Sequence, residues 1–132
     1  RLSELNFDAE VLHVLRGFNI FRMDRAGRSG GGVALLINDC YPSELIASHD
    51  DNYCEYIVVK NRSLKQSYIS FYRPPNTPSQ IFEEAMIKLK ECVLGLQREK
   101  FEVLMYGDFN LPSIRWTDGF GYSNNQKANP LL

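Results

Sequence analysis

The sequence predicts a mixed α/β or α+β fold, and three observations support this prediction. Several short runs are rich in β-branched and aromatic residues, a composition typical of strands. One long stretch, residues 79–98, repeats its apolar side chains at helical spacing. That stretch joins a β-rich run ending at Tyr72 to another ending at Tyr106. We therefore expect a helix between mixed strands rather than a regular alternation of strands and helices.

The first third of the chain is expected to hold a helix and two strands. Residues 8–16, DAEVLHVLR, carry apolar side chains at helical spacing between an Asp that can cap the helix and a Gly that can end it. Residues 18–24, FNIFRMD, predict a strand, and the RAGRSGGG stretch after them predicts a loop. Residues 33–37, VALLI, predict a short strand that is buried on both faces.

Three β-rich runs follow before the long helix. Residues 43–48, SELIAS, predict a short strand. Residues 53–60, YCEYIVVK, and residues 66–73, QSYISFYR, are separated by the short polar segment NRSLK. This spacing predicts a β-hairpin.

The long helix has the clearest signals in the chain. Thr77 is the expected N-cap, Pro78 the first helical residue and Gln80 the third, which together form a capping box. Most charged residues lie on one side and one apolar stripe lies on the other, so this helix should pack on a sheet. The stripe comprises Ile81, Phe82, Ala85, Met86, Leu89, Cys92, Val93 and Leu96.

The charge balance gives no general case for nucleic-acid binding. The net charge is -1, far from the strongly basic character of many such domains. A local patch can still suffice, and Arg16, Arg22, Arg25 and Arg28 form one candidate. The alternative is that these arginines belong to a solvated loop.

The cysteines and the hydropathy pattern indicate a nuclear or cytoplasmic protein rather than a secreted one. The three cysteines are odd in number and have no C-x-x-C spacing, which argues against a disulfide framework and a zinc site. Reduced thiols are typical of intracellular compartments. No apolar run is long enough for a membrane helix, and no signal peptide is recognisable, so no membrane partner is expected.

Two motifs that resemble a phosphate-binding loop and a catalytic His-Asp pair have simpler interpretations. GRSGGGVALLI lacks the Lys-Ser/Thr of a P-loop, and a strand rather than a helix should follow it, so it predicts a flexible turn. His49 stands beside Asp50 and Asp51 in what should be a polar loop, where neighbouring side chains point apart. We interpret His49 as structural or solvent-exposed, and His13 on the first helix as structural.

Polar residues follow two of the predicted strands at the point where each strand ends. In MYGDFNLP, Asp108 and Asn110 come directly after an apolar run, and in SFYRPPN, Tyr72 ends a strand before Asn76 in a proline-rich loop. Gly, Asp and Asn are also the commonest turn residues, so a simple turn is the alternative. If the two strands are neighbours, Tyr72, Asp108 and Asn110 converge at one end of the sheet. There a carboxylate can activate water while hydroxyl and amide groups bind phosphate oxygens.

Taken together, FRMDRAGRSGGGVALLI, FYRPPN and VLMYGDFNLPSIRW resemble the endonuclease/exonuclease/phosphatase superfamily, and most closely the endonuclease domain of non-LTR (LINE-type) retrotransposons. The resemblance extends over nearly the whole chain. It implies a four-layer α/β sandwich with mixed sheets flanked by helices, and a domain that nicks DNA with Mg²⁺. It also implies fusion to a reverse transcriptase in a polyprotein.

The resemblance assigns roles to individual residues. Tyr72 corresponds to the active-site tyrosine near the scissile phosphate, Asp108 to the aspartate that orients or activates water, and Asn110 to the asparagine that holds a phosphate. Asn76 corresponds to the loop asparagine and, with Arg73, is expected to bind substrate.

The resemblance also predicts that residues 1–132 are a partial domain. The metal-binding Glu of the family belongs to an earlier strand, and its catalytic His to a later one, so no metal ligand is assigned within this chain. Little nicking is expected from these residues alone. The alternatives are a catalytically inactive remnant, a domain that only binds DNA, and a phosphatase of the same superfamily.

Overall fold

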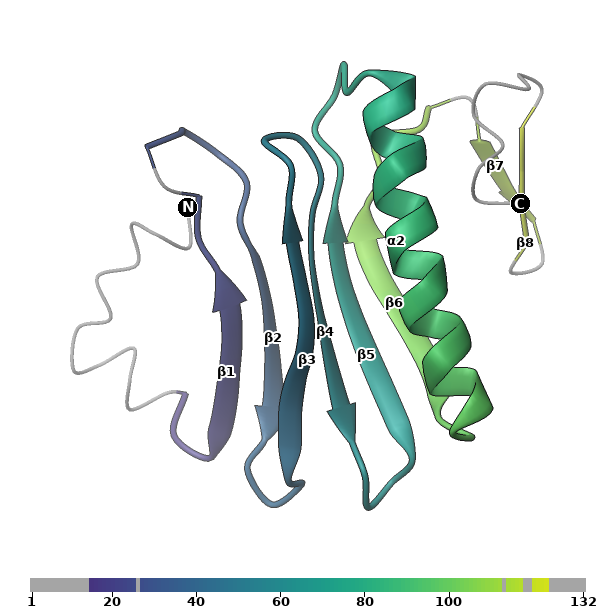
Figure 1. Cartoon of the computed structure of the whole chain (residues 1–132). Helices are drawn as coiled ribbons and strands as arrows, with labels where there is room; N and C mark the ends of the chain where they lie inside the picture. The colour runs from purple at the N-terminus through teal and green to yellow at the C-terminus, as the bar shows by residue number, and fades with distance from the viewer. Residues whose placement is uncertain (1–14, 26, 113, 118–119, 124–132) are drawn as a thin grey trace.

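The computed structural model describes residues 15–25, 27–112, 114–117 and 120–123. The described residues form eight strands and one helix (Figure 1). In chain order these are β1 (Phe18–Met23), β2 (Val33–Asn38), β3 (Ser43–Asp50), β4 (Glu55–Asn61), β5 (Gln66–Tyr72), α2 (Ser79–Arg98), β6 (Glu102–Asp108), β7 (Ile114–Thr117) and β8 (Phe120–Ser123). The helix expected over residues 8–16 falls almost entirely outside the described residues.

The main sheet has the strand order β3-β4-β5-β6. β3, β4 and β5 pair antiparallel, and the predicted hairpin is β4–β5, with Glu55 opposite Tyr72 and Asn61 opposite Gln66. β5 and β6 are parallel, and parallel neighbours need a long crossover, which α2 supplies. The predicted α/β class with mixed strands is therefore confirmed. β1–β2 and β7–β8 are separate antiparallel pairs.

The hydrophobic core lies between α2 and one face of this sheet. Phe71 of β5 stacks on Tyr56 of β4 at 5.9 Å between ring centroids and meets Phe82 of α2 edge-on at 6.3 Å. Phe82 and Leu89 are buried, whereas Met86 is only half-buried. The buried members of the cluster are Cys54, Tyr56, Val58, Ile69, Phe71, Phe82, Ala85, Leu89, Leu96 and Phe101.

The β1–β2 pair packs on the opposite face of the main sheet. Successive side chains of a strand point to opposite faces, so Glu55 points away from the α2 side to which Tyr56 belongs. Glu55 accepts a hydrogen bond from the backbone N–H of Gly32, the residue just before β2, 2.7 Å away. Apart from β7–β8, the described part is thus layered as helix, four-stranded sheet and two-stranded sheet. β2 is not buried on both faces as the sequence predicted, because Leu36 is 45% exposed on the outer face of this pair.

Two details of the predicted elements are wrong. Thr77 does not cap α2, because the N-cap position is Pro78, which has no side-chain cap; the Thr77 hydroxyl instead donates to the carbonyl oxygen of Pro74 at 2.7 Å. β6 does not stop at Tyr106 but continues through Gly107 to Asp108. Within the described ranges, no helix combines the length and apolar character needed to cross a bilayer.

Candidate functional site

The carboxyl ends of β5 and β6 meet at one end of the main sheet. Because the two strands are parallel, both leave the sheet in the same direction (Figure 1). Tyr72, the last residue of β5, is the register partner of Asp108, the last residue of β6. Register partners in neighbouring strands project from the same face. The phenol of Tyr72 and the carboxylate of Asp108 therefore begin side by side on one face of the sheet.

Gly107 allows β6 to approach β5 closely just before this point. A Cβ atom at Gly107 would collide with the carbonyl oxygen of Phe71 and would lie 3.1 Å from the Phe71 Cβ. The glycine of the GDFN sequence is therefore part of the strand rather than of the turn. It is required by the close approach of two backbones.

Asp108 and Asn110 form a tight turn that is tied to the end of β5. A carboxylate oxygen of Asp108 accepts a hydrogen bond from the backbone N–H of Asn110 at 3.1 Å, and Asn110 has a φ of 45°, which Asn tolerates better than most residues. The Asn110 amide donates to the carbonyl oxygen of Arg73 at 2.7 Å. The Arg73 backbone N–H donates to the carbonyl oxygen of Asp108 at 2.8 Å. The same residues therefore make a turn and hold Asp108 beside the loop that follows Tyr72.

Arg73 ties the two loops together through backbone carbonyls. Its guanidinium donates to the carbonyl oxygens of Phe109 at 3.2 Å, Asn110 at 2.8 Å and Thr77 at 3.3 Å. It also lies 4.9 Å from the ring centroid of Phe82 on α2. These contacts engage both terminal nitrogens of Arg73 within the protein, whereas the sequence predicted that Arg73 binds substrate.

A groove of about 950 Å³ opens beside this turn. Asn76, exposed at a φ of 63°, stands on the loop that forms one side of it. Tyr72 is not among the lining residues, although its register partner Asp108 is. The groove is lined by Arg73, Pro75, Asn76, Met105, Tyr106, Gly107, Asp108, Phe109, Asn110, Leu111 and Pro112.

The donor set of this groove does not make a complete magnesium site. Among the residues that the structure describes, Asp108 is the only carboxylate that lines it, and no cluster of three metal-binding side chains occurs. Mg²⁺ takes six oxygen ligands, some of which are usually waters and substrate phosphates.

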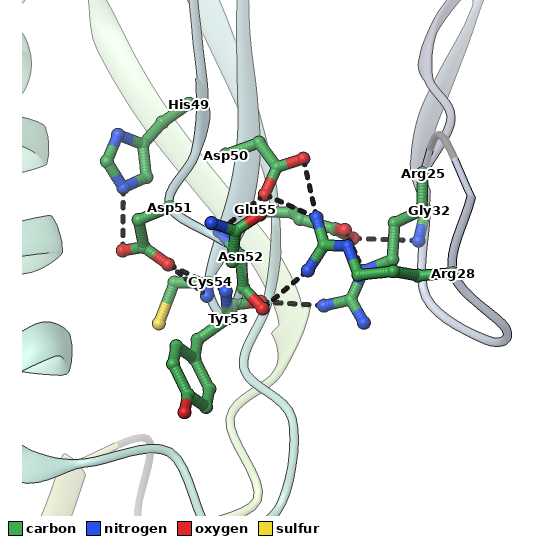
Figure 2. Close-up of polar contacts among 10 residues, drawn as sticks. All are labelled: Arg25, Arg28, Gly32, His49, Asp50, Asp51, Asn52, Tyr53, Cys54 and Glu55. Atoms are coloured by element: carbon green, nitrogen blue, oxygen red, sulfur yellow. Dashed lines mark hydrogen bonds and ion pairs between the residues drawn. The ribbon is translucent and has the colours of Figure 1, made fainter.

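Three of the four arginines in the predicted basic cluster are paired with carboxylates, the first being Arg22, which lies 3.3 Å from Asp24. Arg25 forms an ion pair with Glu55, and Arg28 contacts both carboxylate oxygens of Asp50 at 3.0 Å (Figure 2). Ion pairing reduces the positive potential that these arginines offer to a phosphate backbone. Sequence reasoning missed Glu55, whose signal was a single carboxylate inside the apolar run YCEYIVV of a predicted central strand.

His49 has a structural role, as predicted, although it lies on β3 rather than in a loop. Its Nε2 is 2.9 Å from a carboxylate oxygen of Asp51, and its ring stacks on Tyr56 at 4.9 Å between centroids. The other oxygen of Asp51 accepts the backbone N–H groups of Tyr53 and Cys54 (Figure 2). This network closes the turn between β3 and β4.

Two ionisable groups of this turn have shifted pKa values. Burial, with the nearby charge of Asp51, raises the pKa of the Cys54 thiol to about 12. Partial burial raises the pKa of the Asp50 carboxyl, but the backbone N–H of Asn52 and the Arg28 guanidinium outweigh it, so the net pKa is lowered. All three cysteines of the chain are free thiols.

Comparisons with known proteins do not extend this description: no family model, curated protein or solved structure matches the chain.

Proposed function

We propose that residues 1–132 belong to a Mg²⁺-dependent DNA endonuclease domain of the endonuclease/exonuclease/phosphatase superfamily, of the type found in LINE-like retrotransposons. Its substrate is duplex DNA, of which it nicks one strand to prime reverse transcription. The proposal includes a polyprotein that contains a reverse transcriptase and that is located in the nucleus or cytoplasm.

The observation that supports it most directly is the register of Tyr72 with Asp108. Two parallel strands end together, and the exposed carboxylate of Asp108 lies at the groove with Asn110 two residues later. The carboxyl ends of parallel strands are a usual place for ligands in α/β proteins. If GDFN formed only a turn, nothing would require a tyrosine and an aspartate to be register partners at this edge of the sheet.

The chemistry follows from the donors and acceptors available. The Asp108 carboxylate keeps acceptor capacity beyond its bond to the Asn110 N–H, so it can orient an attacking water or remove its proton. The Asn110 amide uses one N–H on the Arg73 carbonyl and has a second N–H that can donate to a phosphate oxygen. Tyr72 supplies a hydroxyl donor on the same face of the sheet. When bound, a magnesium ion would neutralise phosphate charge.

The test uses a hybrid protein in which residues 1–132 are flanked by the terminal segments of an active endonuclease of the superfamily. Those segments supply the metal-binding Glu and the catalytic His that the resemblance assigns outside these residues. Conversion of supercoiled plasmid to nicked circle is measured with Mg²⁺ and with EDTA. We expect nicking that EDTA abolishes and that Asp108→Ala lowers by roughly 10³-fold or more.

The matched control is Asp39→Ala. Asp39 is an exposed aspartate in the β2–β3 connection, at the other end of the sheet, and its replacement should leave nicking unchanged. Plasmid binding without nicking, with equal behaviour of the hybrid and its Asp108→Ala variant, would favour the DNA-binding-only alternative. Release of phosphate from phosphomonoesters without nicking would favour the phosphatase alternative.

A further inference from the structure

A buried carboxylate lies directly beside the candidate active-site tyrosine. Glu55 is 1% exposed and is the register partner of Tyr72 across β4–β5. Because Tyr72 is in turn the partner of Asp108, the three residues form one row across β4, β5 and β6 on one face of the sheet. A buried carboxylate is strongly destabilising unless it is paired and hydrogen-bonded.

The partners of Glu55 come from the β1–β2 connection. One carboxylate oxygen is paired with Arg25 Nε, and the other accepts the backbone N–H of Gly32 at 2.7 Å (Figure 2). The Arg25 side chain is 11% exposed, and its Nη2 donates to the carbonyl oxygen of Tyr53 at 2.7 Å. Arg25 is therefore held from two sides in one position.

The glycine-rich loop provides the space for this arginine. A Cβ atom at Gly31 would lie 2.5–2.8 Å from the Nε, Cδ and Cζ atoms of Arg25, and Gly31 has a φ of 80°. A side chain at Gly31 would displace the guanidinium or strain the loop. The GRSGGG sequence thus has a packing function that does not involve a bound phosphate.

The held guanidinium lies against the ring of Tyr72. Arg25 Cζ is 5.6 Å from the ring centroid, within the range of a cation–π contact. Tyr72 is half-buried and stands at the end of its strand. A charged group fixed at this distance restricts the orientations that the ring, and therefore its hydroxyl, can adopt.

We propose that Arg25 is a positioning residue for Tyr72. The Arg25–Glu55 pair holds the phenol in the orientation needed beside Asp108. The significance of that orientation for nicking rests on the proposed function, whereas the orientation itself can be measured without activity. Arg25 acts through Tyr72 and does not contact the substrate.

The first experiment measures the environment and orientation of the Tyr72 ring directly. 3-Fluorotyrosine is placed at position 72 of residues 1–132 and of the hybrid, and its ¹⁹F resonance is recorded by NMR. Arg25→Gln should shift the resonance and narrow or split it as the ring gains new orientations. Arg25→Lys should restore the wild-type resonance only in part, because Lys lacks the planar fork that holds Glu55 and Tyr53 together. Arg62→Gln, which removes an exposed arginine paired with Glu44, should leave the resonance unchanged.

The second experiment separates positioning from folding. Arg25→Gln alone leaves the Glu55 charge buried and unpaired, so the double variant Arg25→Gln/Glu55→Gln is included to keep the site neutral. In the hybrid, both variants should lower kcat for nicking by about 10–100-fold with KM nearly unchanged. A wild-type ¹⁹F resonance and wild-type kcat in the folded double variant would overturn the proposal.

The two readouts distinguish the two proposals. If the wild-type hybrid does not nick DNA, the proposed function fails, and the ¹⁹F resonance alone decides whether Arg25 positions Tyr72. If the hybrid nicks DNA but the ¹⁹F resonance and kcat of the Arg25 variants equal those of the wild type, the positioning proposal fails and the proposed function stands.

Discussion

Tyr72 and Asp108 are register partners at the ends of two parallel strands, although 35 residues separate them in the sequence. The crossover helix α2 makes this possible, because it returns the chain to the end of the sheet where β5 began. The loops that follow the two residues are then joined by hydrogen bonds between Arg73 and Asn110 and between Arg73 and Asp108. The candidate site is thus a junction of two strand ends.

Replacement of Asn110 should test the turn and the chemistry separately. Asn110→Ala loses the hydrogen bond to the Arg73 carbonyl and places Ala at a φ of 45°, so unfolding free energy should fall by about 1–3 kcal/mol. Asn110→Gly loses only the hydrogen bond and should cost less. In the hybrid, both should lower kcat by roughly 10²–10³-fold if the amide stabilises the transition state. A raised KM with unchanged kcat would instead assign Asn110 to substrate binding alone.

Alanine at two glycines should have opposite effects on stability. Gly107→Ala places a Cβ against the Phe71 carbonyl oxygen and should lower the free energy of unfolding by about 1–3 kcal/mol. Gly95 lies inside α2 with nothing within 4 Å of an added Cβ, so Gly95→Ala should raise it by about 0.5–1 kcal/mol. Urea unfolding followed by circular dichroism measures both. Equal midpoints for the two variants would contradict the close approach of β5 and β6.

Arg73 should contribute more to the stability of the fold than to substrate binding. Its guanidinium donates to three backbone carbonyls, so Arg73→Gln should lower the free energy of unfolding by about 2–4 kcal/mol. The control Arg62→Gln removes an arginine side chain that is 69% exposed and should change it by less than about 0.5 kcal/mol. Thermal and urea unfolding measure the difference. Unchanged stability together with lost DNA binding would support the prediction that Arg73 contacts substrate.

The cysteines should differ sharply in reactivity. Cys40 is exposed, whereas Cys54 is buried with a pKa raised to about 12, so at pH 8 iodoacetamide should label Cys40 and spare Cys54 until the protein unfolds. Mass spectrometry of timed samples measures this. Because burial raises the folded pKa of Cys54 above the ordinary thiol value of 9.0, its contribution to the free energy of unfolding is fully present below pH 9 and falls as pH rises toward 12. Rapid labelling of Cys54 in the folded protein would contradict its burial.

The elements that the sequence predicted well are those determined by neighbours along the chain. Residues 79–98 form α2 because one apolar stripe recurs at helical spacing, and β4–β5 form a hairpin because two β-rich runs flank a five-residue polar segment. The sequence also indicated that polar residues follow the ends of β5 and β6. It wrongly placed Thr77 at the N-cap of α2, because the helix begins one residue later and Pro78 occupies that position.

Only the tertiary structure decided which distant residues meet. The row of Glu55, Tyr72 and Asp108 joins three strands: the hairpin turn sets the register of β4 with β5, but the parallel pairing of β6 with β5 depends on how the crossover helix α2 packs on the sheet. The pairing of Arg25 with Glu55 could not be predicted either. The partner of a buried carboxylate depends on which loop the fold places over it, and here that loop is the distant β1–β2 connection. Local periodicity therefore determined the strands and the helix of this protein, and long-range packing determined its candidate site.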